Sequence, residues 1–287
     1  MVSLHDLCGL WRRTLIAWPD GRADTETEVF WLQGPRHYAD LRIPAGRPGS
    51  AQAACLRDLD WGLLRFMARQ EGFFGHLDVV NSIGEWQRAF DYQPSTGAAD
   101  RGTLAFENGM LVERGIEQPY VEHWSRPSAP GGAMALALAT ETGTPGCLIA
   151  ADDAFIYARG RAAPLPHGVT LDRLIDDAAS LEAAQDLFDC EISFGRRYGG
   201  VWRIERSSLC FREGAALSLA LDGDAGLLAV DDLTPEGTRV KRTWRITGHE
   251  STNNVPLAVW FGPDATQVAR RPKPTLHMTS EALGASG

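Results

Sequence analysis

The sequence predicts a mainly β protein built as a tandem pair of antiparallel barrels, each interrupted by one helix. Short segments in which apolar and polar residues alternate, separated by turn residues, run through most of the 287-residue chain. This pattern is typical of sandwiches and barrels. Only two segments show helical periodicity, and each interrupts a run of strands. The order of strands and helix in the first half then repeats in the second half.

The first half contains a nearly unbroken series of predicted strands. They cover residues 9–17, 28–33, 37–43, 72–81, 85–93, 102–107, 110–116 and 120–126. Gly34-Pro35 separates the second strand from the third, which predicts a hairpin. Asn108-Gly109 is a favoured two-residue hairpin loop, because both positions tolerate positive φ. The spacing therefore indicates consecutive antiparallel strands.

Residues 53–69 and 171–187 are predicted as helices. In the first segment Leu56, Leu59 and Leu63 recur at the spacing of one helix face. The second segment repeats this spacing with Leu174, Ile175, Ala178 and Leu181. Because these helices interrupt strands rather than alternate with them, a doubly wound α/β fold is disfavoured.

An internal duplication accounts for the repeated order of elements. A shift of 116 residues carries the first helical segment onto the second and Trp86 onto Trp202, and a shift of 120 carries Trp124 onto Trp244. Each half reads as three strands, one helix and five strands. We therefore predict a first barrel over residues 1–127, a second over 128–265, and a loosely structured tail over 266–287.

Composition narrows the functional classes. The formal net charge of −9 disfavours a nucleic-acid partner, and the longest basic cluster, residues 270–273, lies near the end of the chain. Five scattered cysteines without a C-x-x-C pair predict buried thiols in a reducing compartment. No segment approaches the roughly 18–20 apolar residues of a membrane span, and residues 1–13 lack a secretion signal. We expect a cytoplasmic protein without a membrane partner, whose oligomeric state the sequence leaves open.

The motif Gly-x-Trp opens three predicted strands, with its tryptophan at Trp11, Trp86 and Trp202. In lipocalins this motif lies on the first strand, where the tryptophan seals one barrel end. Longer motifs occupy residues 37–42 (HYADLR), 100–102 (DRG), 111–115 (LVERG) and 120–126 (YVEHWSR). Together these motifs resemble the fungal Hri-type calycin family of double lipocalin-like barrels and its uncharacterised bacterial relatives. The resemblance covers roughly residues 9–126 and implies two calycin-like barrels; it implies no catalytic residue.

Three predicted strands of the first half carry aromatic and charged side chains on one face, since alternate residues point to opposite sides. These faces carry Tyr38, Asp40 and Arg42; Trp86, Arg88, Phe90 and Tyr92; and Tyr120, Glu122, Trp124 and Arg126. We expect all three to point into the first barrel, where about eight strands leave room for one small ligand. The predicted ligand-binding residues are Tyr38, Arg42, Trp86, Arg88, Tyr92, Tyr120, Glu122, Trp124 and Arg126.

This surface favours the binding of a small, partly hydrophobic, anionic molecule, packed by aromatic rings and held by an arginine. The alternative is an enzyme, such as an isomerase, cyclase or hydrolase, with an acid–base pair drawn from Asp40, His76 and Glu122. A protein-interaction module without a small ligand and a purely structural salt-bridge network also stay open. Phosphate loops, dinucleotide fingerprints and metal-ligand spacings are absent, so we expect no metal and no cofactor.

Overall fold

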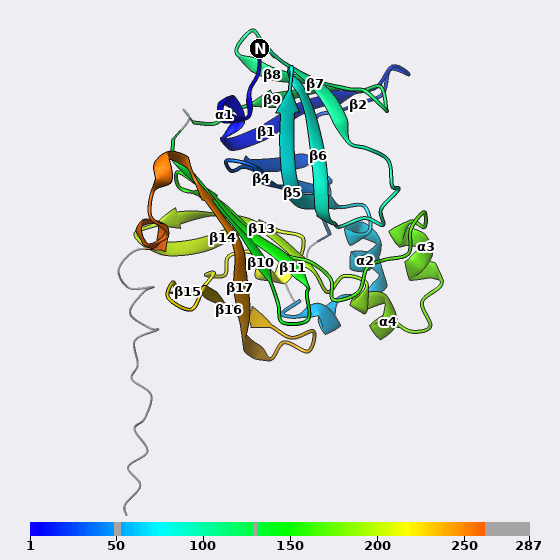
Figure 1. Cartoon of the computed structure of the whole chain (residues 1–287). Helices are drawn as coiled ribbons and strands as arrows, with labels where there is room; N and C mark the ends of the chain where they lie inside the picture. Colours follow the sequence, from blue (N-terminus) through cyan, green and yellow to red (C-terminus); the bar gives the residue numbers. More distant parts are fainter. Residues whose placement is uncertain (49–52, 129–130, 262–287) are drawn as a thin grey trace, which may run out of the picture.

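The computed structural model describes residues 1–48, 53–128 and 131–261. The expected tail over residues 266–287 and the basic cluster at 270–273 lie outside these described residues. Strands dominate the described chain, and they form two antiparallel sheets that follow one another in sequence (Figure 1).

The first sheet closes into a barrel. Its strands are β1 (Gly9–Ala17), β2 (Ala23–Asp24), β3 (Glu28–Gln33), β4 (His37–Ile43), β5 (Glu71–Val80), β6 (Ile83–Asp91), β7 (Arg101–Glu107), β8 (Met110–Gly115) and β9 (Val121–Ser125). From β3 to β9 each strand pairs with the next in sequence, and β1 pairs with both β3 and β9. The short β2 extends only the end of β1. Closure leaves this barrel without a free edge strand.

The second sheet repeats the strand order of the first and curls in the same way. Its strands are β10 (Ala133–Ala139), β11 (Pro145–Ala151), β12 (Ala154–Arg159), β13 (Glu191–Tyr198), β14 (Val201–Ser207), β15 (Leu219–Asp222), β16 (Leu227–Leu233) and β17 (Arg239–Ser251). Here β10 pairs with β11 and β17, as β1 pairs with β3 and β9. Its edges, β14 and β15, meet only where the chain before β15 forms an isolated bridge between Ala216 and Arg203. The predicted duplicated barrel architecture is confirmed.

Each predicted helical segment is divided into two short helices. The structure has η1 (Leu56–Asp58) and α2 (Trp61–Met67) in the first, and α3 (Leu171–Asp176) and α4 (Leu181–Asp186) in the second. A new helix begins after Asp60 and after Ser180, because each side chain accepts a bond from the backbone N–H three residues later. Our prediction of one continuous helix over 53–69 and over 171–187 is therefore corrected. Further short helices are α1 (Leu4–Leu7), η2 (Cys210–Arg212) and η3 (Thr252–Asn254), and residues 257–261 are also helical.

Alternation along the strands separates the barrel interiors from the contact between the barrels. In β4, Tyr38 points into the first barrel, whereas Ala39 and Leu41 pack against β10, β11 and β13 of the second. Phe30 of β3 stacks on Phe194 of β13 across this contact, with ring centroids 4.1 Å apart. The helices α2, α3 and α4 form a further core beside it (Figure 1).

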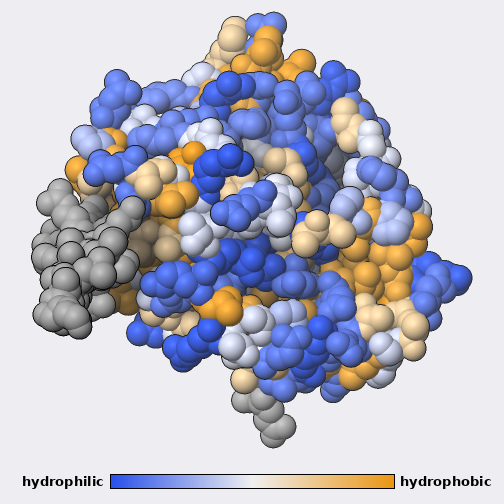
Figure 2. Space-filling model, turned by 60° about the horizontal axis from the view of Figure 1, so that its bottom comes forward, coloured by the Kyte–Doolittle hydropathy of each residue, from blue (hydrophilic) through white to orange (hydrophobic). Residues whose placement is uncertain are grey.

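The outer surface and the cysteines agree with an ordinary globular protein. All five cysteines are buried and free, as the sequence predicts. The face seen in Figure 2 is largely hydrophilic, with hydrophobic side chains gathered in smaller areas. Within the described residues, no helix combines the length and apolar character needed to cross a membrane.

Candidate functional site

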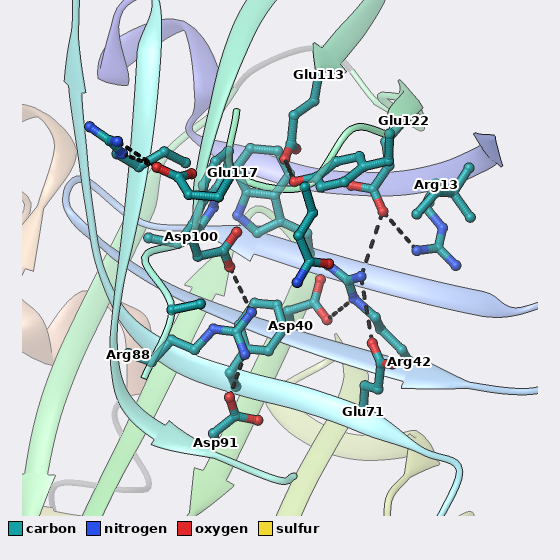
Figure 3. A pocket seen from close by; sticks show the side chains of 18 of the residues that line it. Arg13, Asp40, Arg42, Glu71, Arg88, Asp91, Asp100, Glu113, Glu117 and Glu122 are labelled. Atoms are coloured by element: carbon teal, nitrogen blue, oxygen red, sulfur yellow. Dashed lines mark hydrogen bonds and ion pairs between the residues drawn. The ribbon is translucent and has the colours of Figure 1, made fainter. Parts of the chain in front are cut away.

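The first barrel contains a cavity of about 690 Å³. Its wall is formed by side chains of β1 and β3–β9 and by the β6–β7 connection (Figure 3). Residues 97–99 of this connection are exposed. The aromatic part is built around Trp31, whose ring meets Trp86 and Trp124 edge-on at centroid distances of 6.0 and 5.2 Å. The rest of the wall carries acids and arginines, so the cavity joins an apolar surface to a densely charged one.

Most of the residues predicted from the sequence lie together in this cavity. They are Tyr38, Asp40, Arg42, Trp86, Arg88, Tyr120, Glu122 and Trp124. On β4 the inward direction is fixed because the alternate residues Ala39 and Leu41 are buried between the barrels. The barrel contact thus turns the charged face of β4 toward the lumen.

A β-bulge changes which side chains of β6 face the cavity. Arg88 pairs with Gly75, whereas Phe90 pairs with the preceding residue of β5, so Ala89 is the extra residue. Glycine is needed at position 75 because a Cβ there would overlap the backbone of β6. The predicted alternation through Phe90 and Tyr92 is therefore corrected: Asp91 lines the cavity, and Phe90 packs outside it.

Tyr92 and His76 lie away from the cavity. Tyr92 is buried in the core that the helices form, and its hydroxyl accepts a hydrogen bond from Gln70 Nε2 at 3.4 Å. His76 lies against His37 on the outward side of β4 and β5, with ring centroids 4.2 Å apart. His37 in turn contacts Glu250 of the second sheet, with 2.9 Å between Nδ1 and Oε1. Both residues therefore belong to contacts between the halves.

Arg126 lies at the opposite end of the barrel from the charged wall. Its guanidinium sits 4.3 Å from the ring centroid of Trp11 and donates a hydrogen bond to the carbonyl of Asp6 in α1. Trp11 is buried and packs on Trp31, the centre of the aromatic wall. Arg126 therefore closes the barrel end and does not line the cavity.

An inner ion-pair network spans three strands of the cavity wall. Arg42 Nε donates to Asp40 at 2.9 Å and its Nη1 lies 3.6 Å from Glu122. Arg13 of β1 donates to the same oxygen of Glu122 at 2.8 Å. Burial raises the pKa of Asp40 to about 6, although Arg42 opposes this shift. Buried charges are tolerated here because each has an opposite partner.

A second network binds Arg88 near the mouth. Arg88 donates to Asp91 and, at 2.6 Å, to Asp100 of the β6–β7 connection. Its guanidinium lies 3.8 Å from the ring centroid of Phe73. Burial raises the pKa of Asp91, and Arg88 counteracts it. The guanidinium of Arg88 is thus already engaged by two carboxylates and one aromatic ring of the protein.

Glu113 of β8 is the inner carboxyl without an arginine partner among the described residues. It is 3% exposed, lies opposite Glu122 in the β8–β9 register, and accepts a 2.7 Å bond from the Tyr120 hydroxyl. Gly102 of β7 makes room for it, since a Cβ there would lie 2.8 Å from Glu113 Cγ. Burial and the charge of Glu122 raise the pKa of Glu113 well above its ordinary value. Burial and the neighbouring Glu122 thus both favour the protonated form of Glu113.

Two buried donors of the wall have no hydrogen-bond partner within the described chain. They are the Tyr38 hydroxyl and Trp124 Nε1, on side chains 0% and 2% exposed. An unpaired buried donor is unfavourable by about 1–3 kcal/mol, so native proteins rarely leave one facing an apolar core. Both residues line the cavity, and both donor atoms are themselves buried.

Strand parity alone could have found two residues that our sequence reasoning missed. Arg13 shares a face with Trp11 on β1, and Glu113 shares a face with Leu111 on β8; both Trp11 and Leu111 lie inside the barrel. Asp91 and Asp100 could not be found this way, because their positions depend on the bulge and on an irregular connection.

The acids of the site are not arranged as a metal centre. Across residues 1–48, 53–128 and 131–261, no group of three His, Cys, Asp or Glu side chains could hold a metal ion. Asp40 and Glu122 instead bond to arginines. The arrangement suits recognition of an organic molecule by charge, hydrogen bonds and ring stacking.

Comparison with known proteins gives little further information. No family model matches the chain, and no curated protein matches it. Among solved structures, it is similar to an uncharacterised protein, YLR301w, from the yeast Saccharomyces cerevisiae. The TM-score is 0.48 at 11% identity, over 84% of this chain and 98% of the yeast chain.

Proposed function

We propose that this protein binds one small, partly apolar molecule inside its first barrel. The observation that carries the proposal is a cavity of about 690 Å³ in which two buried donors, on Tyr38 and Trp124, lack a partner within the described residues. Ligand cavities of this size are typically apolar with a few well-placed polar groups. In this cavity the indole rings supply the apolar surface, and the charged side chains supply the polar groups.

The cavity favours binding over the other functions that the sequence leaves open. An acid–base pair containing His76 is disfavoured because His76 lies outside the cavity. Asp40 and Glu122 remain, but both bond to Arg42, which keeps them from moving a proton freely. We therefore propose no reaction. A protein-interaction module would not need an enclosed space with unpaired donors.

We also propose that the chain belongs to the Hri-type calycin family. The proposal is supported by the motifs between residues 9 and 126 and by the tandem arrangement of two similar sheets. Fold and family give no ligand, so the ligand must be argued from the cavity itself.

Native mass spectrometry of freshly purified protein tests the binding function. We expect a small-molecule adduct that is lost on denaturation, and the Trp86→Leu variant should reduce its occupancy by about tenfold, as the loss of a stacking ring predicts. Trp202→Leu is the matched control, because Trp202 is the corresponding G-x-W tryptophan of β14 and packs in the second core. Protein without any adduct, together with no thermal shift across a diverse small-molecule library, would remove the proposal.

A further inference from the structure

Four of the five arginines of the cavity are already paired with carboxylates of the protein. Arg13, Arg42, Arg88 and Arg101 each bond to at least one carboxylate of the wall. Arg69, the fifth, is exposed at the rim and lies over the ring of Phe66. An anionic ligand would have to displace these carboxylates. The expectation of an anionic ligand, made from the number of arginines, is therefore not supported by how they are paired.

The carboxyl groups of the cavity are in excess. Nine carboxylic acids and five arginines line it. Within the inner part, Asp40 and Glu122 balance Arg13 and Arg42, and Glu113 is left over. The inner charges cancel when Glu113 is protonated, and burial favours that form by raising its pKa. A ligand cation can take the place of that proton without disturbing the balance.

The residues around Glu113 fix the position of its carboxyl group. The side chain is buried, Gly102 leaves the space that it fills, and the Tyr120 hydroxyl holds one of its oxygens. A charge-assisted bond from an ammonium group to a carboxylate is about twice as strong as a neutral one. The indole rings of Trp86 and Trp124 line the same cavity, and aromatic faces attract cations.

The unpaired donors specify a second feature of the ligand. An indole N–H can only donate, and a phenol hydroxyl can both donate and accept. Trp124 Nε1 and the Tyr38 hydroxyl, both without a partner among the described residues, therefore call for an acceptor oxygen in the bound molecule. A hydroxyl or carbonyl on a flat apolar body meets this need.

From this pairing pattern we infer that the ligand is an organic cation, a protonated amine on a flat apolar body that carries an acceptor oxygen. Its ammonium group binds Glu113 and its oxygen faces Trp124 and Tyr38. The inference rests on the proposed binding function and names the ligand class. Binding releases one proton: the Glu113 carboxyl gives its proton to the buffer as the ammonium forms the ion pair. The charged and titratable groups that face Glu113 are Glu122, Tyr120, Asp100 and Arg42.

Isothermal titration calorimetry with three matched probes tests the inference. The probes are tyramine, the anion 3-(4-hydroxyphenyl)propionate and neutral 4-ethylphenol, which share a phenol and differ in charge. We expect tyramine to bind at least about tenfold more tightly than the other two, as a buried ion pair and cation–π contact predict. Titration in two buffers of different ionisation enthalpy should show proton release with tyramine alone.

The Glu113→Gln variant should lower tyramine affinity by about tenfold, since the charged acceptor is lost, abolish proton release, and leave 4-ethylphenol binding unchanged. Glu117→Gln, a cavity carboxyl paired with Arg101, is the control and should keep the preference for tyramine. Equal binding of the three probes, tighter binding of the anion, or unchanged tyramine affinity in Glu113→Gln overturns the cation inference while the binding function stands. Binding of none of them also overturns it, and the mass-spectrometric adduct then decides the binding function separately.

Discussion

The two barrels repeat the same strand order but use their interior polar groups differently. In the second barrel the Trp244 indole donates to the Tyr157 hydroxyl at 3.2 Å, and both side chains are fully buried. In the first barrel Trp124 Nε1 and the Tyr38 hydroxyl have no such partner among the described residues. The corresponding tryptophan is thus hydrogen-bonded in the second barrel and lacks a partner among the described residues in the first. The same scaffold thus encloses a packed core in one half and a cavity in the other.

The charged positions show the same contrast. In the first barrel Glu113 of β8 lies opposite Glu122 of β9. In the corresponding strands of the second barrel, β16 and β17, Val230 lies opposite Arg242. Two acids side by side cannot both ionise cheaply in a buried site, whereas a valine beside an arginine leaves one charge to pair. Asp232 provides that partner, 2.7 Å from Arg242 and 3.4 Å from Arg159.

The largest expected difference comes from removing one inner carboxylate in each barrel. Asp232→Asn should destabilise the protein by about 3 kcal/mol, because Arg242 loses its carboxylate partner and Arg159 keeps only Asp189. Asp40→Asn should lower stability by only about 1 kcal/mol, because Arg42 keeps Glu122 at 3.6 Å and Glu71 at 3.7 Å. Urea unfolding at neutral pH measures both variants. Equal losses would show that the two networks are equally interdependent.

A pH-dependent effect is expected at Glu113. Its raised pKa means that the folded state holds a proton that the unfolded chain releases above the ordinary value of 4.5. The wild type therefore loses stability as pH rises through this window, by up to about 1.4 kcal/mol per pH unit. Glu113→Gln keeps an acceptor for Tyr120 and carries no charge, so its stability relative to the wild type should increase as the pH rises above 4.5. Melting temperatures across this range check the sign. If the difference in melting temperature between Glu113→Gln and the wild type does not change with pH, Glu113 is ionised in the folded protein.

The smallest effect is expected at the closed end of the first barrel. Arg126→Ala removes the cation–π contact with Trp11 and the bond to Asp6, and should lower stability by about 1 kcal/mol. Ligand occupancy should not change, because this end lies away from the charged wall of the cavity. Thermal unfolding and native mass spectrometry of the same preparation separate the two quantities. A loss of adduct with unchanged stability would instead place Arg126 in the site.

Strand periodicity predicted which side chains face the cavity only where a strand is regular. On β4 the face with Tyr38, Asp40 and Arg42 is inside the cavity as predicted, because a regular strand alternates strictly. The same rule failed on β6, where one extra residue at Ala89 reversed the direction of everything after it. Nothing in the sequence of residues 85–93 predicts that bulge. It lies opposite Gly75 of β5, whose missing side chain lets the backbone of β6 come close.

The sequence by itself determined the fold class, the repeated order of strands and the presence of aromatic and charged residues on shared faces. These follow from periodicity and turn residues, which act over a few neighbouring positions. Only the tertiary structure decided which charges are neutralised, because ion pairs such as Arg13–Glu122 join residues 109 positions apart. The number of arginines in the sequence led us to expect an anionic ligand, whereas the way these arginines are paired is the basis for our proposal of a cationic one. Which charges form ion pairs depends on which side chains are close in space. Closure of the barrel brings β1 beside β9 and so places Arg13 next to Glu122.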